Sequence, residues 1–347
     1  MDTVNIGVIG IGNCASSLVQ GVRYYADGDR PGLANPVCAG YGIGDVRFTS
    51  AFDVDAAKVG RDLSEAIAAG PNNSREFASV GHLGVTVADG LLADGVSGAV
   101  SGHVDPRGSA TVEDLAAHLT ATGTRVLVNF LPVGAQKATE AYAEAALRAG
   151  CAFVNCMPSV IARDPKWVAR FAGAGLPLVG DDLKSQFGAT LVHHALMDTL
   201  ARNGVRVTST YQLLSGGNMD FLNMQDPERM ATKVASKSSG MVGAGESGAS
   251  KHVGADYNPS LGDRKIAFIR VEGEAFGGTP LELDLKMVVD DSPSAAGNAL
   301  DAVRYAARAM ARGEGGDLGA VSANYMKAPA APLDAAAIAA GLAAYSG

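Results

Sequence analysis

The sequence has little of what marks secreted, zinc-binding or membrane-spanning proteins. Its 347 residues include only four cysteines, at positions 14, 38, 151 and 156, and their spacing matches no zinc framework. No apolar stretch reaches the roughly 18 residues of a membrane helix, and the first residues lack the basic region of a signal peptide. We therefore expect a cytoplasmic protein with reduced thiols and no membrane partner.

Positive charge is also scarce. Lysine and arginine total 28 against 36 acidic residues, which gives a formal net charge of −8, and the basic residues form no run. This excludes nucleic acid as an expected partner, because phosphate backbones require concentrated positive charge. An anionic small molecule would have to be held by a local group of cations or backbone N–H groups.

Glycine, in contrast, is plentiful. The 44 glycines cluster instead of recurring at every third position, which excludes collagen and indicates tight turns and close approach to a ligand. Hydrophobic residues make up 47% and charged residues 18%, as in folded chains. The length exceeds what one hydrophobic core usually holds, so we expect one large or two smaller domains.

Up to about residue 190, short β-branched runs alternate with alanine-rich helical stretches. This alternation predicts a parallel sheet with helices on both faces. The expected strands are 4–9, 46–52, 126–130, 152–155 and 176–179, and the expected helices include 135–149 and 165–172.

The pattern changes near residue 205. A strand over 205–214 is followed by a polar, Gly/Ser-rich segment over 215–260, which predicts a loop region. The runs 266–274 and 281–289 alternate apolar and polar residues, the period of a half-exposed antiparallel hairpin. One apolar face of this hairpin needs a cover, for which another subunit is a candidate.

A long helix is expected from about residue 292 to 312. Ser292 is a plausible N-cap, and Pro293 suits the first helical position. An alanine-rich segment over 334–344 predicts a terminal helix that packs back on the first domain. The whole pattern predicts an α/β fold, in which a Rossmann-type parallel sheet carries an inserted α+β antiparallel domain.

A cofactor motif lies between the first strand and the first helix. It consists of Gly10, Ile11, Gly12, Asn13, Cys14 and Ala15. The glycines permit a turn and let a pyrophosphate reach the N–H groups of the helix N-terminus. The second strand ends at Asp53, with Asp55 as the alternative, and a carboxylate there typically holds the adenosine ribose and favours NAD.

Two further loops follow strands and are candidate walls of the nicotinamide pocket, because ligands lie at the carboxyl ends of such strands. The first contributes Leu131, Pro132, Val133 and Gly134, and the second Asn155 and Pro158. The simpler alternative is that both are ordinary strand-to-helix turns.

Three lysines lie among small or polar residues: Lys184, Lys237 and Lys265. A phosphorylated or enolising substrate needs cations where negative charge sits or develops, and a desolvated lysine can also release a proton. The alternative is three solvated lysines. Neither aspartate pairs nor histidines form a convincing metal site, since His193 and His194 point two ways on one helix, and a metal stays unknown.

Nine ordered segments between residues 8 and 298 carry a resemblance to a known family. They are GIGNCASSLVQGV, AFDVDAAKVG, LPVG, AFVNCMPSVIA, GDDLKSQFGAT, GGNMDFLNM, SKSS, DRKIAFIRVEGEAFGGTPLELDLK and DSPSAAG. Together they resemble the myo-inositol-1-phosphate synthase family in its shorter bacterial form.

The resemblance implies a domain plan and a reaction. Residues 1–197 and 291–347 would form the NAD-binding Rossmann domain, and 198–290 the catalytic and tetramerisation domain of a homotetramer. The family oxidises C5 of D-glucose 6-phosphate with NAD, enolises the ketone, closes C6 onto C1 and returns the hydride, yielding 1L-myo-inositol 1-phosphate. An assisting cation of unknown identity stays open.

The resemblance also implies roles for single residues. Lys184, Lys237 and Lys265 would be catalytic or phosphate-binding, with Asp181 and Asp263 orienting them. Residues at the cofactor would include Asp182, Asp291 and Ser292. The substrate loop would consist of Ser215, Gly216, Gly217, Asn218, Met219 and Asp220.

Departures from the family pattern leave the sugar open. The lysines that larger eukaryotic members carry after the GDD-x-KS motif are absent at 188–193, Ala135 replaces a usual serine, and 239–263 is shortened and glycine-rich. The alternative activity is cyclisation of D-fructose 6-phosphate to a five-membered cyclitol phosphate, as in carbocyclic nucleoside biosynthesis. A simple dehydrogenase and a non-catalytic NAD-binding sensor are the competing classes.

Overall fold

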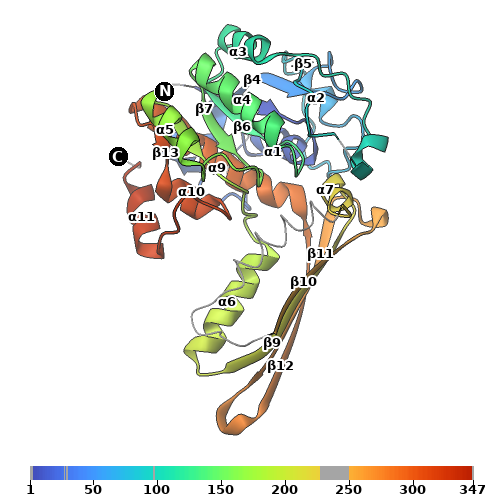
Figure 1. Cartoon of the computed structure of the whole chain (residues 1–347), viewed down its shortest axis with the longest axis vertical. Coiled ribbons are helices and arrows are strands. Elements are labelled where there is room, and N and C mark those ends of the chain that lie inside the picture. Colours follow the sequence, from blue (N-terminus) through green and yellow to red (C-terminus); the bar gives the residue numbers. More distant parts are fainter. Residues whose placement is uncertain (1–2, 27, 29, 97, 227–249, 346–347) are drawn as a thin grey trace.

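The computed structural model describes residues 3–26, 28, 30–96, 98–226 and 250–345. The chain forms an α/β body, and the long strands of a second sheet extend away from it (Figure 1). The predicted fold class is confirmed, since a parallel sheet with helices on both faces carries an inserted unit of strands and a helix.

The first sheet has seven parallel strands in the order β13-β8-β7-β6-β1-β4-β5. Their bounds are β1 Val4–Ile9, β4 Val46–Asp53, β5 Val87–Asp89, β6 Val126–Asn129, β7 Ala152–Asn155, β8 Pro177–Val179 and β13 Gly316–Asp317. From β5 to β8 this is the order of doubly wound dinucleotide-binding sheets, whose ligand crevice opens where the order reverses, beside β1. All residues of β6, β7 and β8 are buried, as expected for central parallel strands.

Helices cover both faces of this sheet (Figure 1). The core of one face joins strand residues to α1 (Asn13–Ala26) and α9 (Asp291–Ala311). The other face packs against α3 (Val112–Ala121), α4 (Gln136–Ala149) and α5 (Pro165–Gly173). The short α2 (Leu63–Ala66) belongs to a third cluster beside β4. Beyond these, α10 (Gly319–Tyr325) contacts α11 (Ala335–Ala343), and the chain end packs on the first core, as predicted.

A buried arginine pins the segment that separates α1 from β4. This segment contains β2 (Val37–Cys38) and β3 (Tyr41–Gly42). Arg304 of α9 is fully buried and donates to the carbonyls of Asn35, Pro36 and Tyr41 at 2.7–3.2 Å and to the Asp301 carboxylate at 2.5 Å. The segment between α1 and β4 is therefore held against α9, the helix that also reaches the cavity described below.

The second sheet has four strands in the order β10-β9-β11-β12. The predicted hairpin is confirmed as β11 (Arg264–Glu274) and β12 (Pro280–Asp290), while β9 (Arg206–Gly216) lies between β11 and β10 (Ser250–Tyr257). The expected loop over 215–260 was wrong in part, since it contains α7 (Met219–Asn223) and β10. The polar composition of β10 concealed it, because its eight residues are held by parallel pairing with β9.

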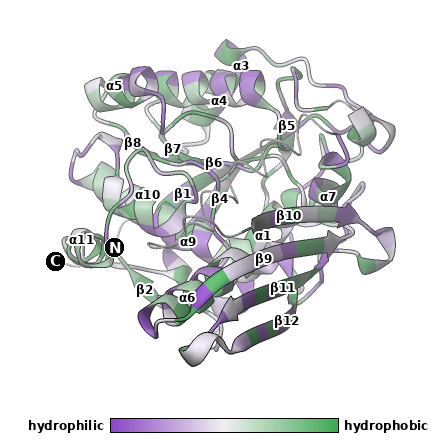
Figure 2. Cartoon of the chain, turned by 60° about the horizontal axis from the view of Figure 1, so that its bottom comes forward, coloured by the Kyte–Doolittle hydropathy of each residue, from purple (hydrophilic) through white to green (hydrophobic). Residues whose placement is uncertain are grey.

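One face of this sheet packs against α6 (Ala189–Arg202) through a shared apolar cluster. The expected domain border at residue 197 therefore cuts through a helix that packs with the second sheet, and the domain borders stay a prediction. On the other face, Leu213, Phe268 and Val288 are 41%, 45% and 51% exposed. Figure 2 shows apolar and polar residues alternating along these strands.

Strand β12 runs directly into α9 without a connecting loop. The helix begins at Asp291, so the prediction of Ser292 as its N-cap was wrong: Asp290 occupies that position and makes no side-chain cap bond. The Ser292 N–H instead donates to the Asp263 carboxylate at 3.2 Å. The carboxylate of Asp263, the residue before β11, therefore caps α9 in place of the local cap that the sequence suggested.

Candidate active site

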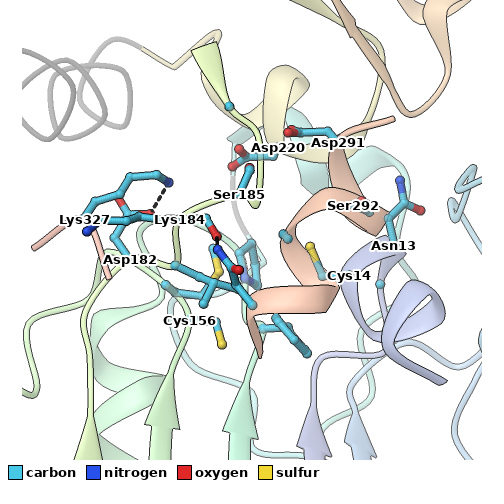
Figure 3. A pocket seen from close by; sticks show the side chains of 18 of the residues that line it. Asn13, Cys14, Cys156, Asp182, Lys184, Ser185, Asp220, Asp291, Ser292 and Lys327 are labelled. Atoms are coloured by element: carbon cyan, nitrogen blue, oxygen red, sulfur yellow. Dashed lines mark hydrogen bonds and ion pairs between the residues drawn. The ribbon is translucent and has the colours of Figure 1, made fainter. Parts of the chain in front are cut away.

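A cavity of about 910 Å³ lies where the carboxyl ends of β1, β4, β6 and β7 meet the second sheet. The start of α1, the loop after β8, the start of α9 and the segment after α10 all contribute side chains to it (Figure 3). The cavity therefore sits at the crevice that the strand order predicts.

The glycine turn forms one wall. Gly10 has φ +80°, and a Cβ there would lie 2.9 Å from the Phe130 carbonyl oxygen, so this position requires glycine. At Gly12 a Cβ would meet no atom within 4 Å, which leaves open space before the first turn of α1. Gly10, Gly12, Asn13 and Cys14 line the cavity, while Ala15 is buried behind them. Burial raises the pKa of the Cys14 thiol to about 12, with Asp263 adding to the effect.

Asp53 lies at the end of β4 and lines the same cavity. Its carboxylate accepts the backbone N–H groups of Ile11 at 2.7 Å, Val54 at 2.8 Å and Asp55 at 2.9 Å. Asp55, the alternative ribose ligand, is buried and not among the cavity residues. Asp53 is therefore the better placed of the two.

The two loops predicted as pocket walls divide into lining and supporting residues. Leu131 and Pro132 line the cavity. Val133 is buried, and its carbonyl accepts from the Asn223 side chain at 2.8 Å. Asn155 is fully buried in a polar network, and the Pro158 carbonyl accepts from Arg163 at 3.1 Å. The last three residues therefore support the wall from behind.

Asp181 does not orient a lysine, so that part of the prediction was wrong. Its buried carboxylate accepts from Asn155 Nδ2 at 2.7 Å, from the N–H groups of residues 161–163, and from Arg163 Nε at 3.2 Å. Burial raises the pKa of this carboxyl. Asp181 therefore holds the segment that follows β7, through its bonds to Asn155 and to residues 161–163.

Lys184 lines the cavity, and its Nζ donates to the carbonyls of Ala323 at 2.7 Å and Asn324 at 3.1 Å. Burial lowers the pKa of Lys184, and the charge of Lys327 lowers it further. Lys327 also lines the cavity, where its Nζ lies 2.8 Å from the Asp182 carboxylate (Figure 3). Two lysine side chains therefore lie on the same side of the cavity. One is bonded to backbone carbonyls and the other to a carboxylate.

Sequence reasoning missed Lys327. It lies in an alanine-rich tail outside the quoted motifs, and long-range backbone pairing between residues 181–184 and 325–328 brings it beside Lys184. A lysine followed by Ala-Pro was its only local signal, which is too weak to single it out.

Lys265 lines the cavity from β11 and forms an ion pair with Asp291, the first residue of α9. Its neighbour Asp263 was expected to orient it, but the Lys265 ammonium donates to the Asp291 carboxylate instead. Asp263 instead accepts from Asn13 Nδ2 and Asn218 Nδ2, both at 3.0 Å, and from Ser292 Oγ at 2.8 Å. Burial raises the pKa of Asp263 against the lowering effect of these bonds.

The expected substrate loop is only partly at the cavity. Asn218, Met219 and Asp220 line it, whereas Ser215, Gly216 and Gly217 are not among the lining residues. Gly217 donates to the Gly262 carbonyl at 3.1 Å, and a Cβ on it would lie 2.4 Å from the Asn258 carbonyl oxygen. These glycines therefore allow close backbone packing beneath the loop.

Lys237 lies outside the described residues. Among the residues that the structure does describe, no group of three His, Cys, Asp or Glu could hold a metal ion. No helix within the same ranges is long and apolar enough to cross a membrane.

A doubly wound sheet, a glycine turn, an acidic strand end and lysines around one cavity are together typical of enzymes that bind dinucleotides. The family model for myo-inositol-1-phosphate synthase matches residues 188–292. An inositol-3-phosphate synthase of Corynebacterium glutamicum is 43% identical over 340 residues, covering 94% of this chain and 93% of that protein. The chain belongs to the myo-inositol-1-phosphate synthase family, and its prediction as an enzyme of the isomerase class is confirmed.

Solved structures agree with this assignment. Ari2 superimposes with a TM-score of 0.86 at 35% identity, and a myo-inositol-1-phosphate synthase-related protein from Thermotoga maritima with 0.80 at 26%. Each comparison covers 99% of this chain and 98% of the other. The inserted sheet is therefore shared with these structures and not confined to this chain.

Proposed function

We propose that the protein catalyses the NAD-dependent, redox-neutral cyclisation of D-glucose 6-phosphate to 1L-myo-inositol 1-phosphate. The observation that carries the proposal is that Lys184, Lys265 and Lys327 line the same cavity as the glycine turn. A hydride site and a cluster of cations are both needed if one site oxidises a sugar phosphate and then stabilises the resulting enolate.

The residues present fit NAD. The open space at Gly12 and the N–H groups that begin α1 suit a pyrophosphate, and Asp53 suits the adenosine ribose. Leu131 and Pro132 would lie along the nicotinamide side of the cavity. When bound there, NAD would supply reversible hydride transfer at C5 of the sugar.

The lysines would supply charge and proton transfer. Burial and the charge of Lys327 lower the pKa of Lys184, which favours the neutral amine that would accept the proton released on enolisation. Lys327, paired with Asp182, would stabilise negative charge on the oxygen of the enolate. Lys265 approaches from the second sheet, with Asp291 fixing its ammonium, and suits the substrate phosphate or the C1 oxyanion.

The remaining expectations belong to the same proposal. Lys237 would add a cation, and Asn218, Met219 and Asp220 would border the substrate. We also propose a cytoplasmic homotetramer, in which the exposed outer face of the second sheet, with Leu213, Phe268 and Val288, is covered by another subunit. Sedimentation of a monomer at micromolar concentration would contradict the tetramer.

The test is incubation of the purified protein with NAD and, separately, glucose 6-phosphate or fructose 6-phosphate. The expected result is an inositol phosphate, identified by NMR, from glucose 6-phosphate without net NADH accumulation. Stoichiometric NADH release would favour a simple dehydrogenase. A five-membered cyclitol phosphate from fructose 6-phosphate would support the alternative cyclase, and absence of any turnover would favour an NAD-binding sensor.

A further inference from the structure

Two buried polar atoms at the cavity wall have no hydrogen-bond partner in the described part of the chain. They are Oε1 of Gln212 and Nε2 of His194. Both residues line the cavity that also contains the lysines. A buried polar atom without a partner destabilises a fold, and native proteins contain few of them. Both atoms belong to residues that line a ligand cavity, so a bound ligand is a candidate source of the missing partners.

Folding alone does not explain why a glutamine occupies position 212 of β9 at the cavity. Thr210, Gln212 and Leu214 share the inner face of β9, because side chains alternate along a strand. Thr210 Oγ1 lies 2.7 Å from His193 Nε2 and so ties this face to α6. Gln212 is only 1% exposed and is paired in register with Ile269 of β11.

The surroundings of Gln212 would suit an apolar side chain. The cluster on this face is apolar, with Leu214, Ile269 and Val271 among its buried members. A leucine would fill the same space without burying an unpaired carbonyl oxygen. The amide is therefore better explained by what enters the cavity than by packing.

The chemistry of the two atoms selects a kind of ligand group. A glutamine carbonyl oxygen only accepts hydrogen bonds, so a phosphate dianion, which also only accepts, cannot complete it. A hydroxyl group donates and accepts, and it can bond to the carbonyl oxygen and to either tautomer of His194. The wall formed by Gln212 and His194 therefore suits hydroxyl groups.

We propose that Gln212 and His194 are specificity-determining residues that bind sugar hydroxyl groups which the reaction leaves unchanged. This inference rests on the proposed function, since it assigns a subsite to the same hexose phosphate. The lysines would then bind the phosphate and the reacting atoms of the substrate. The wall formed by Gln212 and His194 would distinguish sugars by the positions of their other hydroxyl groups.

The first experiment replaces the amide by an apolar side chain of similar size, Gln212→Leu. The KM for the hexose 6-phosphate is expected to rise about tenfold, equivalent to about 1.4 kcal/mol, while NAD affinity stays unchanged. The melting temperature should not fall, because the substitution removes an unpaired buried carbonyl. A lower melting temperature with unchanged KM would overturn the proposal by showing that the amide is structural.

The matched control is Gln225→Leu, the same substitution at an exposed glutamine outside the cavity. It should leave KM and NAD affinity unchanged. His194→Phe tests the second atom and does not depend on the folding of the Gln212 variant. It too should raise KM by several-fold, and an unchanged KM in this variant would remove His194 from the proposal.

The second experiment compares 2-, 3- and 4-deoxyglucose 6-phosphate with glucose 6-phosphate. A site built to bind a hydroxyl rejects the analogue that lacks it. The unsubstituted enzyme should therefore discriminate against one analogue about tenfold or more in kcat/KM, and Gln212→Leu should lose that discrimination. Equal discrimination by both enzymes at every position would overturn the inference alone, whereas no turnover of any hexose 6-phosphate would overturn the proposed function.

Discussion

Removing the Asp263 carboxylate should destabilise the protein and weaken cofactor binding together. This carboxylate accepts four hydrogen bonds, from Asn13, from Asn218 and from the N–H and Oγ of Ser292. It thereby joins the starts of three helices. Of these, α1 follows a strand of the first sheet, and α7 and α9 follow strands of the second sheet. Asp263→Ala leaves these donors without their shared acceptor.

The magnitude follows from those bonds. Hydrogen bonds to a charged group contribute about 1.5–3 kcal/mol each, so four represent about 6–12 kcal/mol gross. Alanine also removes the cost of burying a carboxylate, several kcal/mol, and water in the cavity can reach part of the Asn13 and Asn218 side chains. We therefore expect the free energy of unfolding to fall by about 3–5 kcal/mol.

Urea unfolding followed by circular dichroism measures the stability, and titration calorimetry measures NAD affinity. The affinity should fall as well, because Asn13 loses a bond that fixes it at the turn. Asp198→Ala, at an exposed position of α6, is the control and should change stability by less than about 0.5 kcal/mol. A loss below about 1 kcal/mol for Asp263→Ala, with unchanged NAD affinity, would refute the reasoning.

Three further predictions concern other parts of the structure. Gly10→Ala should lower NAD affinity and stability by about 1–3 kcal/mol, because its Cβ would press on a carbonyl oxygen at 2.9 Å from a backbone with φ +80°; calorimetry that finds neither change would contradict this. Arg304→Met should lower the free energy of unfolding by about 3–5 kcal/mol, since the buried Asp301 carboxylate loses its cation, and a urea midpoint equal to that of the unsubstituted protein would argue against it. Lys327→Met should raise the pKa of Lys184 by removing a neighbouring positive charge, so the limb of kcat/KM that rises with pH should move to higher pH, and a limb that stays or moves lower would show that neutral Lys184 is not the proton acceptor.

The strands and the hairpin could be predicted because their apolar residues have the right period. Strand 4–9 and the alternation of Leu281, Leu283 and Leu285 depend on local sequence, and the structure confirms both elements. Strand β10 could not be predicted, because its polar residues are held by pairing with β9.

The residues of the site also divide into those that local sequence determines and those that the tertiary fold determines. The position of the glycine turn and of Asp53 at the cavity was predictable, since it depends on a short motif after a strand. The direction of Asp181, the approach of Lys327 and the bonds of Asp263 depend on chain segments far apart in sequence. A motif specifies which side chain is present, but the tertiary fold decides which partner that side chain meets.

The unbroken passage from β12 into α9 limits how the cavity can open. Lys265 lies on the strand paired with β12, while Asp291 begins a helix of 21 residues, about 30 Å long, that is packed into the core of the first sheet. Rotation of one sheet against the other would have to bend this rod and break the Asp263 bonds at its start. Under the proposed function, the successive chemical steps would therefore occur in a chamber whose width is fixed at the junction of β12 and α9.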